Sequence, residues 1–291
     1  MKIGAVFPST DIGNDPALLR DFAQTAEGLG LDYLLLPDHV LGAVHAGREP
    51  PLEGPYTEHT PFHEPFVLFA YLAALTTRIG FTTGILILPQ RQTVLVAKQA
   101  AELAILSNDR FRMGVGVGWN YVEYEGLNEN WSDRGKRQEE QIDLLRRLWT
   151  EPVIDYTGRW HRIDRAGILP RPAKPIPIWL GGYADVAHRR AARLADGFIL
   201  PGMKMAQVRE LMVRMRGYLA EAGRDPATFG FEGAVTVHAD ASKWAGQLDT
   251  WREMGASHVV VRTMSRDDHA LPGAGDHVKM LEKWWRTVHG G

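Results

Sequence analysis

Two polar side chains that could move protons stand together directly after a short apolar segment. Asp38 and His39 follow the apolar run at residues 32–36 and a single proline. Imidazole gains and loses a proton near neutral pH, so His39 is suited to general acid–base chemistry. Asp38 could orient that ring or could simply cap the turn, and the sequence leaves both roles open.

A glycine pair marks a second candidate site, in this case for an anion. Gly181 and Gly182 follow the apolar run at 176–180, and a helical segment at 185–195 comes next. Backbone N–H groups at such a strand-to-helix turn are well placed to hold a phosphate. The same glycines could also make only a tight turn, and this stretch alone does not decide between the two.

Three further glycines alternate along the apolar segment FRMGVGV and its next residue. Gly114, Gly116 and Gly118 fall on every second position, so a strand would place them on one face. Because glycine has no Cβ, we expect that face to leave room for a flat or bulky group.

Composition excludes several kinds of chemistry. The 291 residues include no cysteine, which excludes disulfides, thiolate metal sites and a cysteine nucleophile. The first apolar run ends in FPST, without the His-x-His pair that a metal-dependent hydrolase needs there, and no G-x-S-x-G motif occurs. We expect no metal site. An apolar, glycine-lined pocket with one imidazole and a phosphate-type turn favours an organic cofactor that supplies the chemistry.

The charge balance and the hydropathy pattern bear on partners and location. There are 33 basic and 35 acidic residues, so the formal net charge of −2 gives no reason to expect nucleic acid or an anionic membrane as partner. The first residues are too poor in apolar side chains for a signal peptide, and no apolar run reaches about 18 residues. We therefore expect a cytoplasmic protein that acts on a small molecule.

Short apolar runs alternate with helical periods along the whole chain. We expect strands at 2–8, 32–36, 79–88, 111–117, 176–180, 197–200, 229–238 and 258–262. We expect helices at about 16–29, 65–77, 93–106, 136–149, 185–195, 205–222, 244–254 and 276–288. These alternations, without a linker between them, predict an α/β fold in which residues 1–291 form a single (β/α)8 TIM barrel. A doubly wound open sheet is the alternative, but the FPST turn lacks the glycine fingerprint that it would need.

Two segments interrupt the alternation. Residues 40–64 combine prolines, glycines and histidines without a period, which is typical of a lid-like loop. Residues 155–175, rich in arginine and proline, form an insertion between the fourth helix and the fifth strand, which we expect to be part hairpin and part extended. Catalytic groups of a barrel lie at the carboxyl ends of its strands. The expected strand ends are Phe7 to Ser9, Asp38 and His39, Thr83 to Ile85, Gly118 to Asn120, Gly181 to Tyr183, Pro201 to Lys204, His238 and Arg262.

The chain resembles the bacterial luciferase-like flavin and deazaflavin oxidoreductases, in particular their coenzyme F420-dependent branch. The resemblance runs nearly end to end, and its motifs are specific in their order and spacing taken together. They are PDH (37–39), RIGFTTGILILP (78–89), AKQAAELAILSNDRFRMGVGVGWN (97–120) and IPIWLGG…RRAARLADGF (176–198). The family fold is the (β/α)8 barrel.

The resemblance implies roles for the residues at the strand ends. His39 would act as general acid/base or oxyanion stabiliser at the reactive ring atom, and Asp38 would help to orient it. A non-proline cis peptide is expected at Gly84–Ile85, behind the cofactor ring. The residues expected to bind the cofactor are Thr83, Gly84 and Ile85 on one side of the ring, Val117, Gly118, Trp119 and Asn120 on the other, and Gly181, Gly182 and Tyr183 at the phosphate.

The chain also departs from the F420-dependent sugar-phosphate and secondary-alcohol dehydrogenases. Those enzymes have a tryptophan shortly after the strand-two histidine, where this chain has residues 40–43 without one. The sugar-phosphate enzymes place a catalytic glutamate where this chain has Trp119. Lys204 is a tentative substrate-binding residue, because sugar-phosphate-handling relatives place a basic residue there. These departures leave the substrate open.

Three hypotheses follow from the resemblance. The first is hydride exchange between coenzyme F420 and a small organic substrate that enters under the loop 40–64. The second is an FMN-dependent monooxygenase, supplied with reduced flavin by a separate cofactor-reducing enzyme. The third is a flavin-binding barrel without turnover. Relatives are often dimers, so the resemblance is compatible with a homodimer, but the sequence leaves the oligomeric state open.

Overall fold

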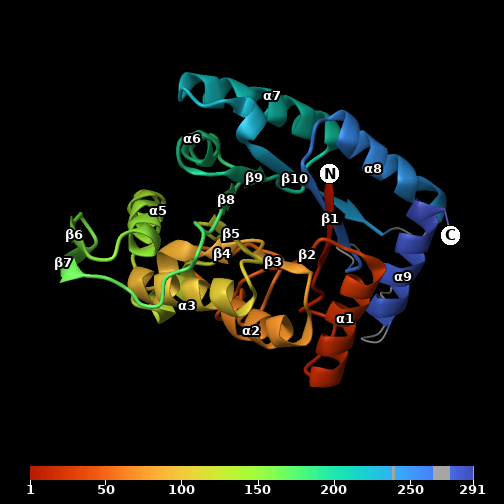
Figure 1. Cartoon of the computed structure of the whole chain (residues 1–291), viewed down its shortest axis with the longest axis horizontal. Coiled ribbons are helices and arrows are strands. Elements are labelled where there is room, and N and C mark those ends of the chain that lie inside the picture. Colours follow the sequence, from red (N-terminus) through yellow and green to blue (C-terminus); the bar gives the residue numbers. More distant parts are fainter. Residues whose placement is uncertain (238–239, 265–275, 291) are drawn as a thin grey trace.

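The computed structural model describes residues 1–237, 240–264 and 276–290, and it confirms the predicted barrel (Figure 1). Within the described residues, eight parallel strands close on themselves, because β3 pairs with β2 on one side and with β5 on the other. The circuit ends where β11 pairs with β1. In order around the barrel the strands are β1 (Lys2–Val6), β2 (Tyr33–Leu36), β3 (Gly80–Thr83), β5 (Phe111–Gly116), β8 (Ile178–Gly181), β9 (Gly197–Ile199), β10 (Gly230–Thr236) and β11 (His258–Arg262).

Helices surround this barrel and bury its outer face (Figure 1). Their limits follow from local chemistry, as in α1, where Asp15 accepts a hydrogen bond from the N–H of Ala17 and Gly30 ends the helix in the left-handed region at φ 92°. The helices that follow strands are α1 (Pro16–Leu29), α2 (Pro65–Leu75), α3 (Thr93–Leu106), α5 (Arg134–Thr150), α6 (Asp185–Leu194), α7 (Met205–Glu221), α8 (Trp244–Glu253) and α9 (Asp276–His289). Short 3₁₀ turns lie at η1 (Leu88–Gln90), η2 (Pro226–Thr228) and η3 (Ala241–Lys243).

Two expectations about secondary structure were wrong. The expected strand at 79–88 stops at Thr83 and resumes only as β4 (Leu86–Ile87), with the cis peptide Gly84–Ile85 between them. A short helix, α4 (Tyr121–Gly126), follows β5, and the sequence reading missed it. His238, expected at the end of the seventh strand, lies outside the described residues.

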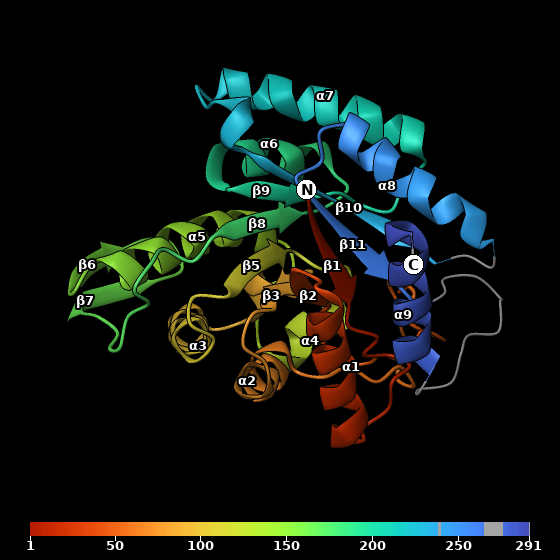
Figure 2. The same cartoon turned by 45° about the vertical axis from the view of Figure 1, so that its right-hand side comes forward.

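The insertion is in part the expected hairpin. Strands β6 (Ile154–Thr157) and β7 (Arg162–Ala166) pair in antiparallel fashion and lie away from the barrel, alongside α5 (Figure 2). Glu140 of α5 accepts hydrogen bonds from the backbone N–H groups of Arg159, Trp160 and His161, which close the hairpin. The ring of His161 also contacts Glu140 and Thr93. His161 therefore ties the insertion to the barrel.

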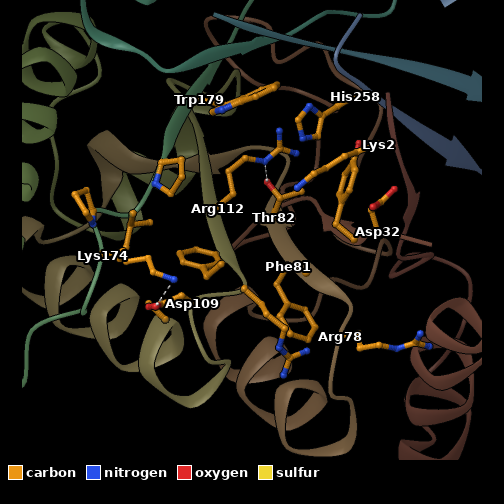
Figure 3. A pocket seen from close by; sticks show the side chains of 18 residues that line it. Lys2, Asp32, Arg78, Phe81, Thr82, Asp109, Arg112, Lys174, Trp179 and His258 are labelled. Atoms are coloured by element: carbon orange, nitrogen blue, oxygen red, sulfur yellow. Dashed lines mark hydrogen bonds and ion pairs between the residues drawn. The ribbon is translucent and has the colours of Figure 1, made fainter. Parts of the chain in front are cut away.

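The amino-terminal end of the barrel carries a cavity of about 490 Å³ (Figure 3). A polar cluster of Arg112, Thr82 and Glu232, with the rings of Trp179 and Tyr33, lies at this end. In this cluster the guanidinium of Arg112 lies 4.0 Å from the ring centroid of Trp179 and 5.0 Å from that of Tyr33. It donates to Glu232 and, at 3.2 Å, to the hydroxyl of Thr82. The Arg112–Glu232 ion pair, stacked between the two aromatic rings, thus fills this end of the barrel interior. Active sites lie at the opposite end of such barrels, so we assign this cluster a structural role.

None of the helices in the described part of the chain is long and apolar enough to cross a membrane.

Candidate active site

The carboxyl ends of the strands surround a cavity of about 580 Å³. It lies at the end of the barrel where catalysis is expected. Seven of the predicted site residues line it: Asp38, His39, Gly84, Ile85, Gly118, Trp119 and Tyr183. The sequence reading did not assign a role to the other lining residues, which are Val6, Thr10, Leu35, Pro37, Pro55, Tyr56, Ile87, Arg262 and Met264.

His39 lies in this cavity under a cluster of aromatic rings. Its side chain is 8% exposed. The ring centroids of Phe62, Tyr56 and Trp119 lie 4.8, 5.2 and 5.5 Å from that of the imidazole. Phe62 and Tyr56 belong to the loop 40–64, so that loop covers the histidine, as a lid-like loop should. The imidazole is therefore held in an apolar setting that excludes most water.

Glu123, which the sequence reading missed, is the acidic residue in contact with His39. Its side chain is fully buried, and its two carboxylate oxygens lie 3.2 and 3.3 Å from Nδ1 of His39. It stands in the first turn of α4, where Asn120 is the N-cap and accepts a hydrogen bond from the N–H of Val122. The pattern Asn-x-x-Glu after a predicted strand is a helix-start signal, and it could have revealed both α4 and Glu123.

Asp38 was expected to help orient His39, and the structure contradicts this. Its carboxylate accepts hydrogen bonds from Arg91 at 2.7 and 3.3 Å and from the N–H of Ile87 at 3.0 Å. Burial raises the pKa of Asp38, and the neighbouring Arg91 opposes that effect. Asp38 therefore fixes the segment after the cis peptide to the end of β2, and its part in the cavity wall is structural.

The glycine face of β5 does not provide the open space that was expected. A Cβ on Gly114 would come within 2.1 Å of the carbonyl oxygen of Thr83, and one on Gly116 within 2.3 Å of the side chain of Ile85. A Cβ on Gly181 would also meet Ile85, at 2.9 Å. Other residues of the protein fill the space beside these glycines: Thr83 and Ile199 lie against Gly114, and Ile85 lies against Gly116 and Gly181. Ile85, and not a glycine surface, therefore forms this part of the cavity wall.

The expected cis peptide at Gly84–Ile85 is present. Thr83, just before it, is fully buried, and its hydroxyl donates to the carbonyl of Gly114 at 2.7 Å. Thr83 therefore supports the wall from behind and does not line the cavity. Val117 and Asn120 do not line the cavity either: the carbonyl of Val117 accepts from Tyr124, and Asn120 caps α4.

The turn from Gly181 to Tyr183 leads into the amino terminus of α6. No hydrogen bond joins the N–H of Gly182 or Tyr183 to any other described residue. The N-cap residue of α6 is Ala184, whose side chain cannot cap the helix. Unsatisfied N–H groups at a helix start suit an anion, so this turn fits a cofactor phosphate. Tyr183 connects the turn to the cavity, because it lines the cavity wall.

Lys204 lies outside the cavity that holds His39. It is exposed and lines a separate cavity of about 600 Å³, together with Gln207, Trp251 and Arg262. Arg262, at the end of β11, lines both cavities. A substrate group at Lys204 would therefore have to extend past Arg262.

In the part of the chain that the structure describes, no group of three or more His, Asp or Glu side chains is arranged to hold a metal ion.

Comparisons with known proteins show which family the chain resembles. A family model described as luciferase-like monooxygenase matches residues 2–283. An uncharacterised protein of Mycobacterium tuberculosis is 36% identical over 206 residues, which cover 69% of this chain and 71% of that protein. An F420-dependent glucose-6-phosphate dehydrogenase of Nakamurella multipartita is 31% identical over 219 residues, covering 72% of this chain and 60% of that enzyme.

Solved structures show the same fold. An F420-dependent secondary alcohol dehydrogenase in complex with an F420–acetone adduct aligns with a TM-score of 0.79 at 16% identity, over 99% of this chain and 98% of that chain. The monooxygenase RslO1 from Streptomyces bottropensis aligns with a TM-score of 0.78 at 17% identity, over 100% and 99% of the two chains.

Proposed function

The chain belongs to the luciferase-like monooxygenase family, and we propose that it is an oxidoreductase that uses coenzyme F420 to exchange a hydride with a small organic substrate. Relatives named F420-dependent glucose-6-phosphate dehydrogenase, at about 31% identity, support F420 as the cofactor. The fold of an F420-dependent alcohol dehydrogenase is consistent with it.

One observation carries this proposal. His39, Ile85 of the cis peptide, Trp119 and Tyr183 line a single cavity, and Tyr183 joins it to the free N–H groups before α6. An imidazole at one end and an anion-binding turn at the other are what a phosphate-bearing redox cofactor requires.

The residues of the chain would then act in distinct ways. The bound deazaflavin would supply the hydride chemistry. The N–H groups of Gly182 and Tyr183 would hold the phosphate, and Ile85 would support the ring. Nε2 of His39, which makes no hydrogen bond to a described residue, would give or take the proton that accompanies the hydride. The aromatic rings of the loop 40–64 would exclude water from that exchange.

The substrate of the dehydrogenase relatives cannot simply be assigned to this chain. No tryptophan occurs at residues 40–43, and Trp119 replaces the glutamate expected after β5. Lys204, the tentative substrate ligand, lines another cavity. We therefore propose a small substrate that fits the aromatic pocket at His39, and we do not extend the sugar-phosphate reaction to this chain.

A titration of the purified protein tests the cofactor. We expect saturable, micromolar binding of F420, followed by its fluorescence, and much weaker binding of FMN. Tight binding of FMN with no binding of F420 would replace this proposal by the FMN-dependent monooxygenase, which needs a separate reductase. Binding of F420 without hydride exchange, over a broad panel of alcohols, aldehydes and enones, would favour a non-catalytic barrel. Binding of neither cofactor would refute the assignment.

A further inference from the structure

We infer that Glu123 is a positioning residue that holds His39 in one tautomer, with Nδ1–H facing its carboxylate and Nε2 facing the cavity. The catalytic consequence rests on the proposed function. The tautomer itself is a property of the free protein and can be measured without any cofactor.

The hydrogen-bond partners of the buried Glu123 carboxylate indicate the tautomer of His39. Glu123 is fully buried, and the described groups that contact it are the backbone N–H of Val40 at 2.5 Å, the N–H of Leu41 at 3.2 Å and Nδ1 of His39. A buried carboxylate needs donors on its oxygens, and the backbone N–H groups of Val40 and Leu41 supply two of them. The third contact is then favourable only if Nδ1 carries a hydrogen, because a bare ring nitrogen would direct its lone pair at the anion.

The other ring nitrogen follows from this assignment. In a neutral imidazole with hydrogen on Nδ1, Nε2 is an acceptor. Nε2 makes no hydrogen bond to a described residue, and His39 lines the cavity. The ring is thus prepared to accept a proton at the cavity side, and Glu123 stabilises the imidazolium that results.

The same carboxylate also holds the beginning of the loop 40–64. Val40 and Leu41 donate to Glu123, and the carbonyl of Leu41 accepts from the side-chain amide of Asn120 at 3.1 Å. Helix α4 therefore fixes both the histidine and the entry of the loop that covers it. The glutamate expected directly after β5 is absent, but a carboxylate reaches the histidine from α4.

The substitution Glu123→Gln gives a sharp test. The amide oxygen must face the two backbone donors, so its NH₂ group faces Nδ1 of His39. Nδ1 then has to accept, and the hydrogen moves to Nε2. We expect long-range ¹H–¹⁵N spectra of the free protein to show the Nδ1–H tautomer in the wild type and the Nε2–H tautomer in the variant. Glu125→Gln, at an exposed position on the same helix, is the matched control and should leave the His39 signals unchanged.

The cofactor-loaded enzyme provides a second readout. We expect Glu123→Gln to lower kcat about 100-fold, with cofactor affinity near that of the wild type. Glu123→Asp, which keeps the charge, should restore part of kcat.

Two results would overturn the inference. One is an Nε2–H tautomer in the wild-type protein. The other is a Glu123→Gln variant, folded by circular dichroism, with the wild-type tautomer and the wild-type kcat. If the protein binds no flavin or deazaflavin, the proposed function fails, but the tautomer measurement still decides the role of Glu123.

Discussion

The indole of Trp119 packs directly on Gly54, where a Cβ atom would come within 2.2 Å of Cζ3 of the ring. Trp119 lines the cavity after β5, and Gly54 belongs to the loop 40–64. The absence of a side chain at residue 54 therefore allows the loop to close onto the wall of the active site.

This contact predicts a specific effect of Gly54→Ala. The added methyl group must displace the loop or the indole, so we expect KM for the substrate to rise several-fold while the free energy of unfolding changes by less than about 1 kcal/mol. Steady-state kinetics and chemical denaturation measure the two quantities. Gly217→Ala, at a position where a Cβ meets no atom within 4 Å, is the control. Unchanged kinetics in Gly54→Ala would mean that the closed loop is not needed for turnover.

His39→Ala should separate binding from turnover. Removing the imidazole leaves the anion-binding turn intact, so we expect nearly wild-type cofactor affinity and a loss of kcat of about 10²–10⁴-fold. Titration with the cofactor and steady-state assays give both values. His59→Ala is the control, because the side chain of His59 is 86% exposed. If His39→Ala kept a near wild-type rate, the proton-transfer role would be wrong.

Asp38→Ala tests the corrected role of Asp38. The substitution removes a buried carboxylate and leaves Arg91, 12% exposed, with Glu64 as its remaining ion-pair partner. We expect the free energy of unfolding to fall by about 3 kcal/mol, measured by urea denaturation. Asp164→Ala removes an exposed ion pair with Arg165 and should change stability by less than about 0.5 kcal/mol. Equal effects of the two substitutions would contradict the structural role of Asp38.

Ala184→Asp tests the phosphate turn. An aspartate at this N-cap would accept hydrogen bonds from the first N–H groups of α6, and we expect it to stabilise the fold by up to about 1 kcal/mol. Its charge would also repel a phosphate, so F420 should bind at least about tenfold more weakly. Binding of the deazaflavin without its phosphate tail should change little, which provides the control. Equal weakening for both ligands would place the phosphate elsewhere.

His258 predicts how stability depends on pH. Burial, and then the neighbouring Arg112, lowers the pKa of His258 to about 3. In the unfolded chain the same ring takes up a proton below about pH 6.5, while the folded protein stays unprotonated there. The unfolded state therefore binds more protons, and the contribution of His258 to stability falls as pH drops from about 6.5 toward 3, by up to about 1.4 kcal/mol per pH unit.

The substitution His258→Asn isolates this effect. We expect the loss of unfolding free energy between about pH 7 and pH 5 to be smaller in the variant than in the wild type, as measured by urea denaturation at each pH. Other buried histidines, such as His188 and His277, contribute equally to both proteins and cancel in the difference. Parallel pH profiles for the two proteins would show that His258 takes up its proton in the folded state.

The sequence by itself determined the barrel, because each strand and helix carries its own local signal. Alternating apolar runs and helical periods define the repeating units, and parallel strands followed by helices have few ways to close. The sequence also located His39 and the turn at Gly181 and Gly182, and the family resemblance implied the cis peptide at Gly84–Ile85. All of these are encoded by residues close together in the chain.

Only the tertiary structure decided which side chains meet. His39 follows β2 and Glu123 lies in α4, Asp38 has Arg91 as its partner, and Ile85 fills the space in front of Gly116. A periodicity assigns a residue to an element and a face, but not to a contact across the barrel. Those contacts depend on which hydrogen-bond donor lies beside each buried charge once the barrel has closed. The free energy of leaving a charge unpaired in the interior exceeds the free energy of any local conformational preference.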